Sequence, residues 1–144
     1  MADGKARPLS LALSPGQASD SKWMEPTLDA VRVPRPARGR PRKRPGKLRN
    51  DKGYSYARCR QALRRRGIKH LIPERRDQRE QRAKKGRQGG RPVVFVQAEY
   101  AKRNVVERCI LRLKQFRRVA TRYEKRANIY LAMVTLAAIM LWLR

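Results

Sequence analysis

The positive charge of this chain restricts its folding more than any other feature of the sequence. Lys and Arg number 38 against 11 Asp and Glu in 144 residues, which gives a formal net charge of +27 at pH 7. Such an excess repels itself unless it meets a polyanion, of which nucleic acid is the usual one and an anionic membrane surface the second. This balance excludes an ordinary acidic or neutral cytosolic enzyme, and the length allows one domain.

Apolar residues are unevenly spread, although they make up 40% of the chain. An uncharged run at residues 129–143 would span about 22 Å as a helix, short of the roughly 30 Å core of a bilayer. We interpret it as a buried helix rather than a membrane anchor. Cys59 and Cys109 stand alone, without a Cys-x-x-Cys motif or a His cluster, which predicts neither a disulfide framework nor a zinc site. A reducing cytosol is the expected compartment.

The order of the predicted elements is that of an α/β protein. Asp3-Gly4 is typical of a hairpin turn, and the alternating Leu residues after it predict a strand at 7–13. Ser19 or Asp20 caps a predicted helix that ends before Pro34. The remaining predicted elements are an exposed basic loop at 35–49, a weak strand at 48–51, a helix at 55–66 closed by Gly67, a strand at 68–72, a mobile basic linker at 74–92, and helices at 98–123 and 128–143.

The predicted helix at 98–123 separates an apolar face from a polar stripe. On a helical wheel the apolar face contains Val105, Val106, Cys109, Ile110, Leu113 and Phe116. Beside it, one narrow stripe contains Tyr100, Arg103, Glu107 and Lys114. Helix statistics alone favour an ordinary solvated stripe with an i, i+4 pair between Arg103 and Glu107.

The spacing within this stripe, Tyr-x2-Arg-x3-Glu-x6-Lys, resembles the signature of the DDE transposases of bacterial insertion sequences, specifically the IS-four and IS-five groups. The surrounding segments Arg103-Asn104-Val105-Val106-Glu107-Arg108-Cys109 and Arg112-Leu113-Lys114-Gln115-Phe116-Arg117 are similar to the C-terminal part of IS-five transposases. Upstream, Asp51-Lys52-Gly53-Tyr54-Ser55 resembles the second acidic motif of that family. The resemblance covers nearly the whole chain.

This resemblance implies a ribonuclease-H-like fold and DNA transposition, that is, phosphodiester cleavage and strand transfer at insertion-sequence ends. Such chemistry uses two Mg²⁺ or Mn²⁺ ions held by acids that converge from different elements. The resemblance assigns the catalytic, metal-binding roles to Asp51 and Glu107. We therefore expect their carboxylates to approach closely enough to share one ion.

The departure from the family pattern concerns the first catalytic acid. By resemblance it lies on a first strand upstream of the Asp3-Gly4 hairpin, and that strand is absent here. Asp3 is better explained as a turn residue, and Asp20 and Asp29 are no better placed. Lys47 and Arg49 also put charge into what should be a buried strand. We expect the chain to be the C-terminal part of a catalytic domain, from a split reading frame or a decayed remnant, that binds DNA without cutting it.

DNA is the expected partner, both as insertion-sequence ends and as target. The residues that we predict to contact it are Tyr100, Arg103, Arg108, Arg112, Lys114, Lys52, Arg38 and Arg40. Within this set, Arg38-Gly39-Arg40-Pro41 resembles the core of an AT-hook, which lies in a narrow minor groove.

Other expected partners are the upstream-frame product or an intact transposase, with homo-oligomers when the protein is complete. The expected location is the bacterial cytoplasm, associated with the nucleoid. Two other classes remain open: a small non-catalytic nucleic-acid-binding protein, and a tail-anchored membrane protein with a basic cytosolic part.

Overall fold

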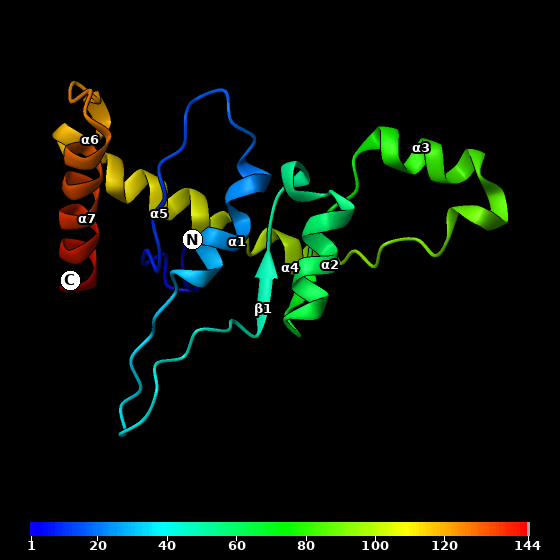
Figure 1. Cartoon of the computed structure of the whole chain (residues 1–144), viewed down its shortest axis with the longest axis horizontal. Coiled ribbons are helices and arrows are strands. Elements are labelled where there is room, and N and C mark those ends of the chain that lie inside the picture. Colours follow the sequence, from blue (N-terminus) through cyan, green and yellow to red (C-terminus); the bar gives the residue numbers. More distant parts are fainter. Residues whose placement is uncertain (144) are drawn as a thin grey trace.

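The computed structural model of the chain describes residues 1–143 and has a mixed α/β architecture, with helices arranged along an elongated molecule around a small sheet (Figure 1). The sheet has two parallel strands, β1 (Lys47–Arg49) and β2 (Lys69–Leu71). The α-helices are α1 (Met24–Asp29), α2 (Ala57–Arg65), α3 (Arg76–Lys84), α4 (Gln97–Ala101), α5 (Asn104–Lys114), α6 (Arg117–Thr121) and α7 (Ala127–Leu143). Short 3-10 turns lie at Asp20–Trp23 (η1), Lys52–Tyr54 (η2) and Gly86–Gly89 (η3).

One hydrophobic cluster, called here the β-unit, joins α1, α2 and the two strands. Its buried side chains are Met24, Leu28, Leu48, Cys59, Ala62, Leu63, Ile68 and Ile72. Gly67 ends α2 with a φ of +62°, a left-handed conformation that favours glycine, and the chain then turns directly into β2. The helix at 55–66, its closing glycine and both of these strands were predicted in this order, and the structure confirms them.

A second hydrophobic cluster, called here the helical unit, packs α5, α6 and α7 against the N-terminal turn. Its buried members are Ala6, Cys109, Leu113, Val119, Val134, Ala137, Ala138 and Leu141. Trp142 in α7 donates a 2.7 Å hydrogen bond from Nε1 to the carbonyl of Pro8, so the two ends of the described chain meet. The helix predicted at 128–143 is confirmed. None of the helices in residues 1–143 is long and apolar enough to cross a membrane.

The predicted strand at 7–13 is wrong. Asp3 to Ala6 form the expected turn, but pairing beyond it is limited to one antiparallel bridge between Ala2 and Pro8. A strand needs a partner along its length, and within residues 1–143 this segment has that one bridge instead of a paired strand. Leu9 to Leu13 therefore continue as irregular chain that the helical unit partly covers, with Leu11 packed against that unit.

Two predictions for the second half of the chain also need correction. The single helix at 98–123 is divided into α4, α5 and α6, because the chain makes tight turns at Lys102–Arg103 and at Gln115–Phe116. The supposed linker at 74–92 contains α3, which the Arg76–Glu80 ion pair of 2.7 Å supports at i, i+4 spacing. Its predicted mobility stays a prediction. In Figure 1, α3 projects at one end of the molecule and α7 stands at the other.

The basic loop at 35–49 is exposed as predicted, except that its last three residues form β1. Val33 and Arg42 close its base with two backbone hydrogen bonds, of 3.0 and 2.8 Å. Residues 34–41 thus form a narrow arm that extends away from the rest of the protein (Figure 1).

Candidate functional site

Asp51 lies directly after β1, where a strand passes into a turn. Its side chain caps η2 and accepts a 2.9 Å hydrogen bond at Oδ1 from the backbone N–H of Gly53. This arrangement is an Asx-type turn, and it holds the carboxylate of Asp51 at the edge of a cavity. The position at a strand end is the one predicted from the motif.

The pKa of Tyr54 depends on the negative charge of Asp51. Burial, together with the negative charges of Asp20 and Asp51, raises the pKa of the Tyr54 phenol to about 12. Two carboxylates therefore lie near one half-buried phenol, although Asp20 and Asp51 are far apart in the sequence.

Glu107 lies in the first turn of α5, and its carboxylate is mostly exposed, at 57% of the side chain. It pairs with Arg103 at 2.8 Å, as the i, i+4 spacing predicted. The Arg103 guanidinium also lies 5.8 Å from the centre of the Tyr100 ring, which in turn packs at 5.2 Å against Phe95. The break after Ala101 therefore keeps Tyr100, Arg103 and Glu107 as neighbours.

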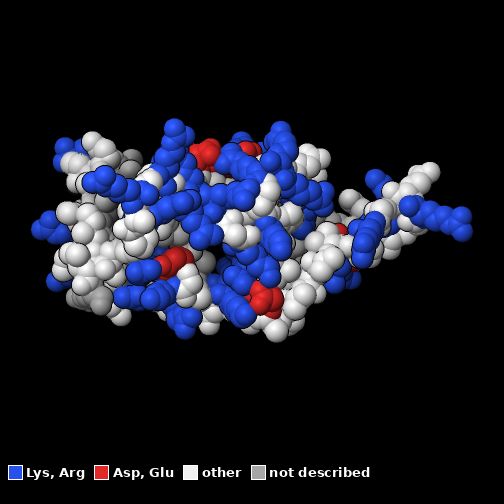
Figure 2. All heavy atoms as spheres, turned by 90° about the horizontal axis from the view of Figure 1, so that it is seen from below, with Lys and Arg blue, Asp and Glu red and all other residues white. Residues whose placement is uncertain are grey.

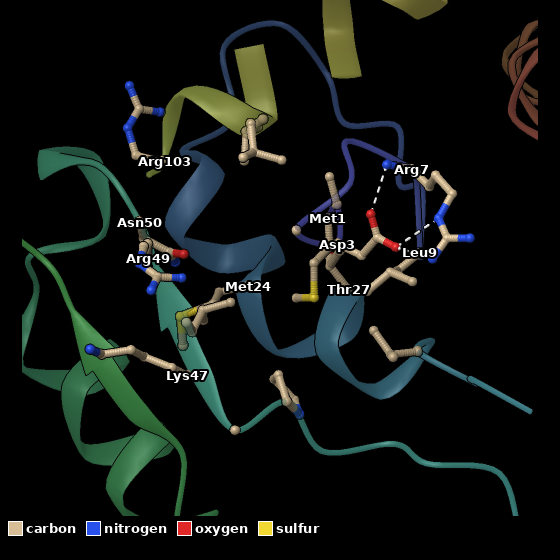
Figure 3. A pocket seen from close by; sticks show the side chains of 18 of the residues that line it. Met1, Asp3, Arg7, Leu9, Met24, Thr27, Lys47, Arg49, Asn50 and Arg103 are labelled. Carbon is tan, nitrogen blue, oxygen red and sulfur yellow. Dashed lines mark hydrogen bonds and ion pairs between the residues drawn. The ribbon is translucent and has the colours of Figure 1, made fainter. Parts of the chain in front are cut away.

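A cavity of about 620 Å³ separates β1 from the N-terminal turn. Its lining includes Asp3, Asp20 and Asp51, together with Arg103 from the turn before α5, whereas Glu107 is not among the lining residues. Figure 3 shows Lys47, Arg49 and Asn50 on one side of this cavity and Met1, Asp3 and Leu9 on the other.

The carboxylate of Asp3 forms its hydrogen bonds and its ion pair within its own turn. Its Oδ1 accepts 2.9 Å hydrogen bonds from the backbone N–H groups of Lys5 and Arg7, and its Oδ2 pairs with the Arg7 guanidinium at 2.7 Å. Burial opposes ionisation of Asp3, but these hydrogen bonds and the Arg7 charge outweigh it and lower the pKa of Asp3. The role of Asp3 as a turn residue is confirmed.

The carboxylates of this region do not form the donor set that two hard cations require. Within residues 1–143 no three His, Cys, Asp or Glu side chains gather closely enough to hold a metal ion. Of the two candidate ligands, Asp51 accepts from its own turn and Glu107 is paired with Arg103. Because Mg²⁺ demands several oxygen ligands in near-octahedral geometry, the residues described here do not fit a two-ion centre.

Glu99 is a structural residue that sequence reasoning missed. Its carboxylate accepts from Lys102 at 2.6 Å, from Lys47 at 2.8 Å and from Arg49 at 2.7 Å. These hydrogen bonds, that of Lys102 foremost, lower the pKa of Glu99 well below its usual range. The charges that looked misplaced in β1 therefore join β1 to α4. Only the i, i+3 pair with Lys102 could have been found from the sequence.

The cations predicted to contact DNA lie on two parts of the surface. Arg108 and Lys114 are exposed on α5, Arg112 is half-buried there, and Lys52 is exposed beside Asp51. Arg38 and Arg40 are exposed on the arm at 34–41, where Gly39 has a φ of +145°. Figure 2 shows Lys and Arg covering much of one face, with few acids among them.

Comparison with known proteins identifies the class to which this arrangement belongs. A family model described as "Transposase DDE domain" matches residues 1–143. The chain belongs to this family of DDE transposases, which generally use divalent metal ions.

One relative adds detail within this class. The chain is 34% identical over 134 residues to a protein from Burkholderia cepacia named as a transposase for insertion sequence element IS402. The match covers 93% of this chain and 56% of that relative, so the chain spans little more than half of the relative's length. No solved structure matches significantly.

Proposed function

We propose that this chain is a DNA-binding protein derived from a transposase of the IS-five group, and that it binds DNA without cutting it when alone. The observation that carries the proposal is the transposase family match over residues 1–143 in a chain of net charge +27. The complete family domain is expected to have a ribonuclease-H-like fold and to catalyse strand transfer at insertion-sequence ends.

The distribution of ion pairs supports binding to a polyanion. In residues 1–143, nine of the eleven acids pair with ten Lys or Arg side chains. Most of the 38 basic residues therefore keep an uncompensated charge. Such charges neutralise phosphates, and the release of counterions makes the resulting affinity strongly dependent on salt.

Asp51 and Glu107 are the acids to which we assign the family's catalytic roles. Asp51 follows a strand and Glu107 lies on a helix, which are the positions that the family resemblance gives to its second and third acids. The donor set within residues 1–143 is insufficient for the two-ion chemistry, and catalysis that depends on positioned metals falls steeply when ligands are missing. Binding without cleavage follows.

DNA binding is tested by titrating labelled duplex with purified chain between 50 and 200 mM salt. We expect the logarithm of the association constant to fall linearly with the logarithm of salt concentration, at about 0.9 per neutralised phosphate. The double variant Arg108→Gln/Lys114→Gln should reduce that slope by about 2. The control Lys5→Gln/Lys22→Gln removes the same charge from exposed positions outside the predicted contacts and should change the slope less.

Cleavage is tested by incubating the chain with supercoiled plasmid and Mg²⁺ or Mn²⁺. We expect no nicking by the native chain or by Glu107→Gln. Nicking by the native chain that Asp51→Asn and Glu107→Gln both abolish would show that a third ligand has been overlooked. Equal effects of the two double variants on the salt slope would instead favour a non-catalytic basic protein without a defined DNA-binding face.

A further inference from the structure

The arm at 34–41 presents positive charge that no acid of the described chain neutralises. Its three arginines, Arg35, Arg38 and Arg40, are all exposed. None of the ion pairs within residues 1–143 involves them. The surrounding sequence offers no partner either, because residues 30–50 contain no Asp or Glu. These cations are therefore available to a polyanion.

The arm is thin, because its arginines are its only large side chains. The other five residues of the arm are proline, alanine and glycine. The chain bends at 36–39, and within residues 1–143 no backbone hydrogen bond involves residues 34–41. The arm is thus extended chain that is paired only at its base, through Val33 and Arg42. Four residues at about 3.3 Å each would take its tip roughly 13 Å from that base. Figure 1 shows the arm clear of the helices.

The two grooves of B-DNA admit different kinds of structure. The major groove is about 12 Å wide and accepts a helix or a two-stranded ribbon, whereas the minor groove is about 6 Å wide and about 7.5 Å deep. The arm is neither a helix nor a hydrogen-bonded ribbon, and its reach of roughly 13 Å exceeds the depth of the minor groove. Extended chain with small residues between its arginines suits the narrower groove. That groove is narrowest, and its potential most negative, in A·T tracts.

The backbone around Gly39 is adapted to close contact with another molecule. Gly39 has a φ of +145°, a conformation that other residues rarely adopt. No atom of the protein lies within 4 Å of the place that a Cβ would occupy there, so packing within the protein is not what requires glycine. Pro41 has a fixed φ and favours an extended Arg40 before it. Less conformational entropy is therefore lost when this segment binds.

We propose that the arm binds in the minor groove of A·T-rich duplex DNA, where Arg38 and Arg40 recognise the base pairs. In that groove A·T and T·A pairs present only acceptors, whereas a G·C pair adds the 2-amino donor of guanine. Guanidinium groups only donate, so they match the acceptors and are opposed by the amino group. The inference rests on the proposed DNA binding and deepens it. The other basic surfaces supply affinity for phosphates, and the arm supplies a preference for base composition.

Four duplexes separate the two grooves. They share their flanks and differ in a central tract of A·T, G·C, inosine·C or 2,6-diaminopurine·T pairs. Inosine lacks the 2-amino group, so inosine·C has the minor groove of A·T and the major groove of G·C, and diaminopurine·T has the reverse. We expect the full chain to bind the A·T and inosine·C duplexes at least about 10-fold more tightly than the other two, at one salt concentration.

A charge-preserving variant locates the preference. Arg38→Lys/Arg40→Lys keeps both positive charges but replaces each planar guanidinium with a compact, strongly hydrated ammonium. The preference should fall to less than about 3-fold, while the dependence of binding on salt stays the same because the number of cations is unchanged. The control Arg108→Lys/Arg117→Lys makes the same change at exposed positions of α5 and α6 and should keep the full preference. Circular dichroism and thermal unfolding confirm that both variants fold.

Three outcomes would overturn the proposal and leave the proposed function intact. Equal binding of all four duplexes would leave contact with phosphates alone. A preference for A·T together with diaminopurine·T would place the contact in the major groove. A preference that survives Arg38→Lys/Arg40→Lys would assign it to another part of the chain. Failure of the chain to bind any of the duplexes would contradict the proposed function as well.

Discussion

The β-unit and the helical unit are stabilised by different means. The helical unit packs three helices on one another, and its longest member, α7, is apolar on every side. The β-unit has two strands of three residues, and ion pairs of charged side chains connect β1 to α4. Asp51 belongs to the β-unit and Glu107 to the helical unit. The relative position of the two candidate acids therefore depends on the contacts between the units rather than on either core.

The largest expected effect comes from opening a core. Leu63 is fully buried in the β-unit and Leu141 is 2% exposed in the helical unit. Each Leu→Ala change should lower the free energy of unfolding by about 2–5 kcal/mol, through lost apolar burial and a residual cavity. Hydrogen exchange should show loss of protection in α2 and β2 for Leu63→Ala, and in α5 and α7 for Leu141→Ala.

The matched control is Leu111→Ala, since Leu111 is 63% exposed. Its effect on the free energy of unfolding should stay within about 0.5 kcal/mol. Loss of protection throughout both units in either core variant would show that the β-unit and the helical unit unfold together. The difference between the two units would then concern their packing and not their stability.

Trp142→Phe should have a smaller effect, confined to the contact between α7 and the N-terminal segment. It removes the hydrogen bond to the Pro8 carbonyl and weakens the cation–π contact in which Arg7 lies 4.1 Å from the indole. We expect a loss of about 1–2 kcal/mol by chemical denaturation. Trp23→Phe, at a half-buried indole outside this contact, should cost less. An equal cost would mean that ring size alone explains the result.

Glu99→Gln tests the charged connection between β1 and α4. The pKa of Glu99 is lowered in the folded chain, so its contribution to stability is fully present above the unfolded pKa of about 4.3 and declines as pH falls through the folded value. Native chain and variant should therefore differ at pH 7 and converge in acid. Faster exchange of the β1 amides is expected in the variant at pH 7.

The corresponding control is Glu80→Gln, which removes an ion pair within α3. It should leave exchange of the β1 amides unchanged. A difference between native chain and Glu99→Gln that persists undiminished at low pH would show that the carboxylate charge is not what stabilises this connection.

The smallest effect is a shift in the titration of Tyr54. Its phenol should ionise near pH 12, measured by ultraviolet absorbance, and Asp51→Asn should lower this pKa because one of the neighbouring negative charges is removed. Glu107→Gln should leave the Tyr54 pKa unchanged. An equal decrease in both variants would place Glu107 as near to Tyr54 as Asp51 is, and would bring the two candidate acids together.

The elements that the sequence predicted correctly are those with a local cause. Gly67 ends α2 because its positive φ strains any side chain, and α7 was predictable because residues 129–143 form a long run without a charged side chain. The predicted strand at 7–13 fails for the opposite reason. Its alternation of apolar residues is real, but a strand exists only where a partner supplies hydrogen bonds.

In the candidate site, too, the features with a local cause can be distinguished from those that depend on distant parts of the chain. Asp51 and Glu107 are assigned from their resemblance to family motifs, and that assignment stays a prediction. The Arg103–Glu107 pair follows from helix periodicity, and the structure confirms it. The pairing of Lys47 with Glu99 could not be predicted, because 52 residues separate them in the chain. The cavity beside β1 could not be predicted either, since its walls come from five separate parts of the chain.

The sequence by itself determined the charge, the family and the local elements, because each depends on composition or on neighbours within a few residues. Tertiary structure alone decided which cation meets which acid, and that Asp51 and Glu107 lie in different units. Those relations depend on packing between segments distant in the chain. Such contacts gain free energy only once the whole arrangement has formed, so no local pattern records them.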